Sequence, residues 1–341
     1  MLDDKKIIKR NLGIQILRSL LCFWVLLNHC YNPNSQKLRK IVFKYRLHVP
    51  TFILISFYFS NKIFCCLSVT KIKNRFERLL IPYFILPIII LIINNLLYIF
   101  TSFGSFGKIL NIKDLFYQYL FGRDIIPTFW FQFYLLWSTT LFIIISFLFK
   151  EKFSIIIIHI FLISYYFQYS NVNYKYFSSF ISIVKYSLGS FLEMLPISVS
   201  GCLISSLNIF SLIKHNIITI YISLLSLFLI LYFEVFRPIP KISFSGVVLN
   251  ISSVFLFIIF YISPLNYIKS TTITKIILTA TKYTQGIYSL HMFLKLILNP
   301  KIKMVKYGTF NGCIFLYIFC YIISFIGNKI TKKNKLIYLF I

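Results

Sequence analysis

Long apolar runs, each about the length of a bilayer-spanning helix, follow one another along nearly the whole chain. A transmembrane helix needs about 20 consecutive apolar residues, and short polar connections separate the runs. The pattern predicts an all-α, polytopic helical bundle with about ten membrane spans. We expect these at about residues 12–31, 48–69, 79–100, 128–149, 154–169, 194–212, 216–233, 244–264, 284–298 and 309–327. Residues 170–193 are only half apolar, which suggests an interfacial helix.

Composition agrees with a membrane protein and leaves no room for a large soluble domain. Of 341 residues, 58% are hydrophobic and 13% are charged, and the mean hydropathy is +0.81. We therefore expect one integral-membrane domain over residues 1–341, embedded over about 11–327, with a short basic tail at 328–341. The basic start of the chain before the first apolar run is similar to a signal peptide. However, Tyr31-Asn-Pro-Asn34 offers no small-residue cleavage site, so we interpret the run as an uncleaved first span.

The net charge of +28 does not indicate nucleic-acid binding, because the basic residues are scattered between apolar spans rather than gathered on one face. Anionic headgroups, or a ligand such as a nucleotide phosphate, fit this distribution better. The chain has only eight acidic residues, and its seven cysteines show no CxxC spacing. We therefore expect no metal site, structural zinc or disulfide framework. Ten spans put both termini on one side, and a slight excess of Lys and Arg there favours the cytoplasm.

Arg18 and His29 stand eleven positions apart within the first apolar run. Eleven helical steps return to nearly the same face about 16 Å further along, so both polar groups point the same way. An arginine near mid-span costs about 2.5–3.5 kcal/mol on insertion scales and therefore needs a partner, a wet cavity or a function. The alternative is that the two side chains reach opposite membrane interfaces.

Arg75 and Arg78 lie three positions apart, just before the third span begins, where they are neighbours on a helix. Two planar guanidiniums side by side match the oxygens of a phosphate or diphosphate. Juxtamembrane arginines are also ordinary topology determinants, so both interpretations remain open.

Three further residues are candidates for the site, but each of them taken alone is weaker evidence for function. Trp130, within Phe129-Trp130-Phe131, is also typical of an interfacial aromatic belt. Tyr288 and His291 lie one turn apart in the ninth span, where a histidine is often a hydrogen-bonded structural residue.

Taken in order, these motifs resemble the acyltransferase-3 family of membrane acyltransferases. The resemblance covers about residues 11–327 and rests on five segments: Arg18 to His29, His48 to Ser56, Arg75 to Pro82, Phe129 to Phe131, and Gly286 to His291. It implies about ten membrane helices, cytoplasmic termini, residence in the cytoplasmic (inner) membrane of a bacterium, and acyl-CoA, most simply acetyl-CoA, as donor. The implied reaction is O-acetylation of a hydroxyl on a cell-surface or lipid-linked glycan, such as an O-antigen.

The resemblance also implies roles for single residues. His29 and Arg18 match the family's Arg-x10-His pair, so both are expected to be catalytic. His29 would be the base, and Arg18 would lie on the donor path, where it could hold a phosphate or pantetheine-linked group or stabilise negative charge. Arg75 and Arg78 match its Arg-x-x-Arg pair and would hold the CoA phosphates. The segments around them suggest substrate or pore positions at Ser56, Trp130, Tyr288 and His291.

One departure from the family pattern concerns the second span. The family usually has Ser-Gly there, whereas this chain has Ser56-Phe57-Tyr58, which argues against close helix approach at that point.

Three other functions fit a basic polytopic helical protein, and one of them, a small-molecule exporter, is not excluded by composition. A lipid-linked oligosaccharide flippase tends to be longer and to contain internal repeats, which this chain lacks. A glycan polymerase usually carries a large extracytoplasmic loop, and the longest connection, 101–127, is short for one. The acyl group, acetyl or a longer one such as succinyl, and its route, direct or through an acyl-enzyme, are both open.

Overall fold

The structure is a computed structural model. It describes residues 11–32, 47–101, 110–121, 130–169, 182–207, 247–263, 266, 270–298, 302, 305 and 308–331. These residues are almost entirely helical, and none of them lies in a strand. The helices are α2 (Leu12–Cys30), α4 (His48–Cys66), α5 (Val69–Thr101), α6 (Ile112–Phe121), α7 (Trp130–Phe149), α8 (Phe153–Tyr169), α9 (Ser182–Ser206), α12 (Val247–Tyr261), α13 (Thr271–Ala280), α14 (Thr284–Leu298) and α16 (Phe310–Ile330), with a short 3-10 turn at Lys150–Lys152.

The prediction of an all-α, polytopic helical protein is confirmed. Five of the described helices are long and apolar enough to cross a membrane: Leu12–Cys30, His48–Cys66, Val69–Leu96, Trp130–Phe149 and Phe310–Ile330. Shorter apolar helices occur at Phe153–Ser164, Met194–Ser206 and Leu249–Tyr261. The predicted seventh span, at 216–233, lies outside the described residues, so the number of ten stays a prediction.

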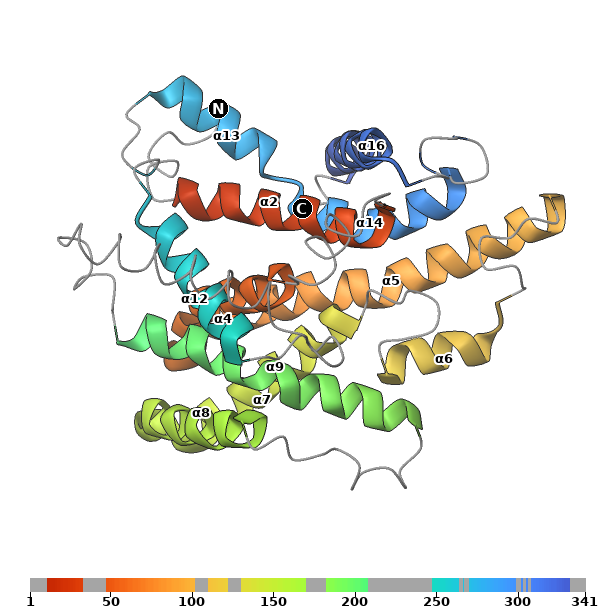
Figure 1. The fold of residues 1–341 in the computed structure, drawn as a ribbon. Helices are drawn as coiled ribbons and strands as arrows, with labels where there is room; N and C mark the ends of the chain where they lie inside the picture. The colour runs from red at the N-terminus through yellow and green to blue at the C-terminus, as the bar shows by residue number, and fades with distance from the viewer. Residues whose placement is uncertain are drawn as a thin grey trace.

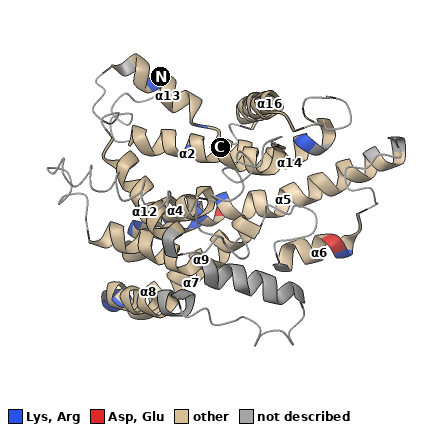
Figure 2. Cartoon of the chain, viewed as in Figure 1, with Lys and Arg blue, Asp and Glu red and all other residues tan. Residues whose placement is uncertain are grey.

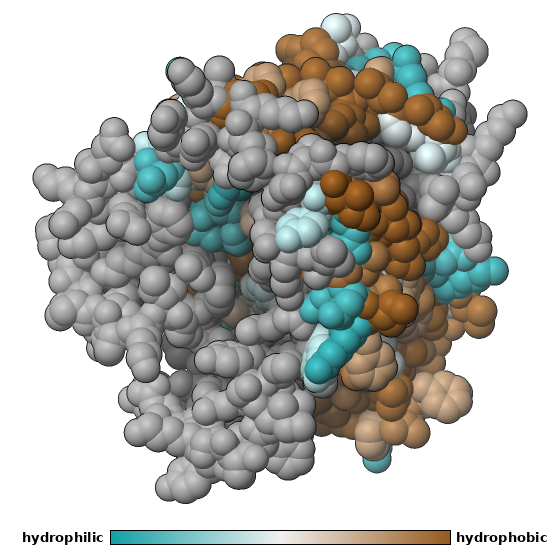
Figure 3. Space-filling view, turned by 90° about the vertical axis from the view of Figure 1, so that its right-hand side faces the viewer, coloured by the Kyte–Doolittle hydropathy of each residue, from teal (hydrophilic) through white to brown (hydrophobic). Residues whose placement is uncertain are grey.

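The surface of α16 illustrates why these helices need an apolar solvent. Ile318, Ile322 and Ile326 lie on one face of the helix and are about half exposed, whereas Leu316 and Cys320 on another face are fully buried. Figure 3 shows that apolar side chains cover much of the described surface on this side of the molecule. A face of this kind is suited to lipid rather than water.

Two boundaries differ from the sequence-based expectation. Residues 182–206 form one continuous helix, α9, so the predicted separation into an interfacial helix up to 193 and a span from 194 was wrong in this part. Helix α5 begins at Val69 and runs for 33 residues, about 50 Å, because the basic connector 71–78 continues the third span as helix. Arg75 and Arg78 therefore lie on the same helix as the span that follows them.

The helices form two groups on either side of α5 (Figure 1). One group contains α2, α13, α14 and α16, and the other contains α4, α7, α8, α9 and α12. Helix α4 packs against α9, α12, α2 and α7, so it lies at the centre of the second group and also joins it to the first.

Close approach between α4 and α9 occurs at Gly201. A Cβ atom at this position would lie 2.7 Å from the carbonyl oxygen of Leu54 and 3.2 Å from the Cβ atom of Phe57. The expectation that Phe57, in place of a glycine, argues against close packing was therefore wrong. The glycine that permits the contact is on the facing helix.

Candidate functional site

Two polar clusters lie inside the helical bundle, and together they contain most of the residues predicted from sequence. We call the first, made of His29, Tyr288, His291 and Lys295, the histidine site. The second, made of Ser56, Arg75 and Thr139, we call the arginine site. Charged residues are sparse in the described part of the chain, and several of them gather near α4 (Figure 2).

The histidine site joins the end of α2 to α14. The imidazole rings of His29 and His291 lie with their centroids 5.5 Å apart and their planes tilted by 36°, a separation typical of contacting aromatic rings. The Nζ atom of Lys295 donates a hydrogen bond to the carbonyl oxygen of His29, at 2.5 Å. The last carbonyls of a helix have no partner within the helix, so this bond fixes the turn that carries His29.

His291 is held in one orientation by its own helix. Its side chain is 1% exposed, and its Nδ1 atom lies 2.7 Å from the carbonyl oxygen of Tyr288. A carbonyl oxygen can only accept, so Nδ1 carries the hydrogen and, in the neutral ring, Nε2 carries the lone pair. Nε2 is buried and has no hydrogen-bond partner among the described residues.

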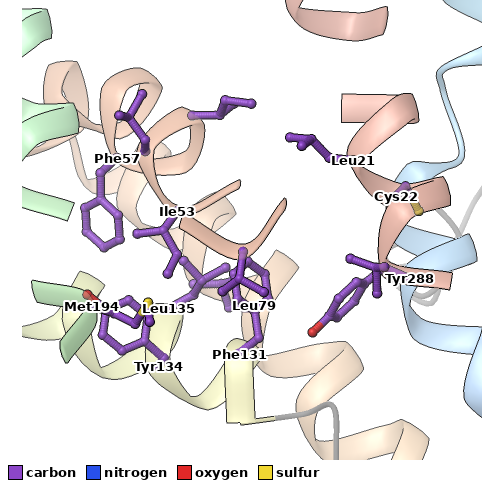
Figure 4. Packing of buried hydrophobic residues seen from close by; sticks show 14 of the residues in the cluster. Leu21, Cys22, Ile53, Phe57, Leu79, Phe131, Tyr134, Leu135, Met194 and Tyr288 are labelled. Atoms are coloured by element: carbon purple, nitrogen blue, oxygen red, sulfur yellow. The ribbon is translucent and has the colours of Figure 1, made fainter. Parts of the chain in front are cut away.

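The start of α7 completes the histidine site. The ring of Phe131 lies 5.3 Å from that of Tyr288, and Gln132 Nε2 lies 3.5 Å from the hydroxyl of Ser289. Figure 4 shows the Tyr288 side chain pointing away from α14, toward Phe131. Trp130 is partly buried, and its ring centroid lies 6.2 Å from that of Phe131, which in turn contacts Tyr288. Phe129 lies outside the described residues.

Arg18 does not belong to the histidine site. Helix α2 is continuous from Leu12 to Cys30, so Arg18 is about three turns, or about 16 Å, from His29 along the same helix. The structure therefore separates the backbones of the two residues by about three turns of one helix.

The arginine site brings together two motifs that are separate in the sequence. The Nη2 atom of Arg75 on α5 donates to Ser56 Oγ on α4 at 2.7 Å and to Thr139 Oγ1 on α7 at 3.4 Å. Its guanidinium carbon lies 6.0 Å from the centroid of the Phe57 ring. Its Nε atom is buried without a hydrogen-bond partner in the described part of the chain. The guanidinium of Arg75 thus lies inside the bundle, among α4, α5 and α7.

Arg78, one turn further along α5, is exposed. The two arginines are neighbours on the helix, as predicted, but they are in different environments. Arg78 is the more exposed of the two and is accessible from outside the bundle.

Sequence reasoning missed two members of these clusters. Lys295 lies four positions after His291, so the helical repeat could have placed both on one face. Thr139 is one of three consecutive hydroxyl residues, 138–140, in an otherwise apolar span, and polar side chains in such spans usually face other helices.

Within the described residues, no group of three or more His, Cys, Asp or Glu side chains could hold a metal ion. Comparison with known families gives one match: a family model described as an acyltransferase domain matches residues 11–329. No curated protein and no solved structure matches the chain significantly.

Proposed function

Since the chain belongs to the acyltransferase-3 family and is a membrane acyltransferase, we propose that it moves an acetyl group from acetyl-CoA to a hydroxyl of a cell-surface or lipid-linked glycan. The observation that carries this proposal is the histidine site, where two imidazoles from α2 and α14 meet beside a lysine. Transfer of an acyl group from a thioester to a hydroxyl needs a base for the hydroxyl proton, and imidazole has the suitable pKa class.

In the proposed reaction, His29 takes the proton of the acceptor hydroxyl while the hydroxyl oxygen attacks the thioester carbonyl carbon. A C–O bond forms and the C–S bond breaks, and CoA leaves as a thiolate. The thiolate then takes the proton from His29, which returns the imidazole to its neutral form. Negative charge develops on the carbonyl oxygen during the attack, and positive side chains in a low-dielectric site stabilise it. Arg18, on the same helix, serves the donor path rather than the reacting atom because of its distance from His29.

Arg75 and Arg78 are proposed to hold the CoA phosphates. Arg78 is exposed, and a planar guanidinium on the surface matches the oxygens of a nucleotide phosphate. Arg75 donates hydrogen bonds to Ser56 and Thr139, so its contribution is a fixed positive charge inside the bundle, one turn from Arg78. This arrangement supports a donor that enters near the start of α5. With cytoplasmic termini, that end faces the cytoplasm, where acyl-CoA is made, and the protein lies in the inner membrane of a bacterium.

The proposal is tested by mass spectrometry of surface glycan from cells with and without the gene. Loss of a mass increment of one acetyl group, removable by mild alkali in the control, is the expected result. An increment of one succinyl group would identify a longer donor. Unchanged modification with shortened or missing surface glycan would overturn the proposal in favour of a flippase or polymerase.

The role of His29 is tested by replacing it. We expect His29→Ala to abolish the modification at normal protein level, because loss of a general base typically lowers the rate about 10²–10⁴-fold. The control is His159→Ala, which removes an exposed histidine from α8. Full transfer by His29→Ala would exclude a catalytic role.

A further inference from the structure

The second histidine of the histidine site, His291, has a ring nitrogen that accepts no hydrogen bond from the described residues. His291 is fully buried, and its Nε2 atom is without a hydrogen-bond partner in the described ranges, although its other ring nitrogen is engaged. Buried polar atoms of side chains are almost always hydrogen-bonded, so an exception inside a candidate active site calls for a functional explanation.

The chemistry of this atom is decided by the backbone. Because the Tyr288 carbonyl engages Nδ1–H, Nε2 of the neutral ring can accept a hydrogen bond but cannot donate one. Two titratable rings neighbour that of His291: the ring centroid of His29 lies 5.5 Å away and that of Tyr288 lies 6.0 Å away. Of the two, His29 is the proposed base. His291 therefore offers His29 a fixed lone pair of the kind that a carboxylate offers the base in a catalytic triad.

A need for such an acceptor follows from the proposed reaction. When His29 takes the hydroxyl proton it becomes a cation, and a hydrogen-bond acceptor beside the ring stabilises that cation. Lys295 adds a further positive charge next to it, through its bond to the His29 carbonyl. Carboxylates are scarce in this chain, which has only eight acidic residues.

We propose that His291 is a positioning residue whose Nε2 atom accepts a hydrogen bond from the His29 ring when His29 takes up the hydroxyl proton. In that state it orients the ring and stabilises the imidazolium formed during acyl transfer. The proposal rests on the proposed function and deepens it by naming the residue through which the base acts.

A double-mutant cycle on glycan acylation by the full-length protein tests the coupling. His291→Phe keeps a planar ring but removes the acceptor, and we expect it to lower the turnover rate about 10²-fold. His291→Gln, which returns an acceptor oxygen, should recover part of that loss. The double variant His29→Ala/His291→Phe should be no slower than His29→Ala, because residues that act as a unit are not additive.

The matched control is His159→Phe. His159 makes the same kind of bond, from Nδ1 to the carbonyl of Ile155 in its own helix, but it lies exposed on α8. We expect this variant to keep its activity. Rate losses that multiply in the cycle, or a fully active His291→Phe, would overturn the proposal.

A second measurement decides the role of His291 without any activity assay. The measurement is ¹⁵N NMR of protein carrying ¹⁵N-labelled histidine. The pair of ring-nitrogen signals that disappears in His291→Phe should show Nδ1 protonated and Nε2 unprotonated at neutral pH. A ring protonated at Nε2 would overturn the inference. Absence of acyl transfer in the wild-type protein would instead overturn the proposed function, and the nitrogen signals would still identify the tautomer.

Discussion

The contact between Ser56 and Arg75 gives a prediction whose size can be worked out from the structure. Ser56→Ala removes the acceptor that lies 2.7 Å from Nη2 of Arg75 and leaves only the longer contact to Thr139, at 3.4 Å. The guanidinium already has one buried atom, Nε, with no hydrogen-bond partner in the described part of the bundle. Among the described residues, the substitution therefore leaves the Arg75 guanidinium with one long hydrogen bond, to Thr139, and the contact with the Phe57 ring.

Two ranges bound the expected cost. Hydrogen bonds to charged groups contribute about 1.5–3 kcal/mol in proteins. Side-chain hydrogen bonds between membrane helices average about 0.6 kcal/mol and reach about 1.7 kcal/mol. Because the donor here is charged and the bond short, we expect Ser56→Ala to lower the free energy of unfolding by about 1.5 kcal/mol.

The matched control is Ser60→Ala, one turn further along α4. The hydroxyl of Ser60 donates to the carbonyl of Ser56 in its own helix, at 2.7 Å, and bonds no charged group. We expect this control to change stability by less than about 0.5 kcal/mol, because the carbonyl keeps its helical partner. Both variants are compared by detergent-induced unfolding in mixed micelles. Equal losses of stability for Ser56→Ala and Ser60→Ala would refute the idea that Arg75 is held by Ser56.

Three further predictions concern other contacts. Gly201→Ala should lower the free energy of unfolding by about 1–3 kcal/mol, because the added methyl would meet the Leu54 carbonyl at 2.7 Å; normal thermal stability in detergent would contradict the close packing of α9 on α4. Lys295→Met should lower stability by about 1 kcal/mol and reduce turnover, since the turn carrying His29 loses its side-chain cap; unchanged values in unfolding and acylation assays would exclude this role. Arg78→Ala should raise the KM for acyl-CoA about tenfold and have little effect on stability, because Arg78 is exposed and would contact a phosphate of the donor. An unchanged KM would show that Arg78 does not belong to the donor site.

Helix positions were largely readable from the sequence. The ninth predicted span, 284–298, has the bounds of α14, and the tenth, 309–327, differs from α16 by a few residues. These boundaries are encoded by neighbouring residues, because they depend on runs of apolar residues and on capping groups such as Thr309, whose hydroxyl accepts a hydrogen bond from the amide of Gly312. The motifs that led to the family are likewise short sequence segments.

Hydropathy alone failed where helical structure continues beyond the apolar run. Helix α5 extends backwards through its basic connector, and α9 begins at Ser182 although the residues up to 193 are only half apolar. Hydropathy indicates which part of a helix is stable in lipid, whereas backbone hydrogen bonding decides how far the helix extends.

The amino-acid sequence by itself determined that the protein needs an apolar environment, that its fold is all-α, and which residue types are available for chemistry. It predicted Arg75 beside Arg78, since neighbours on one helix follow from its period. Only the tertiary structure decided which helices face each other, and thereby joined His29 to His291 and Ser56 to Arg75. The physical reason is that such contacts depend on the rotation and packing of separate helices. His29 and Lys295 are 266 positions apart, and no local pattern encodes their meeting.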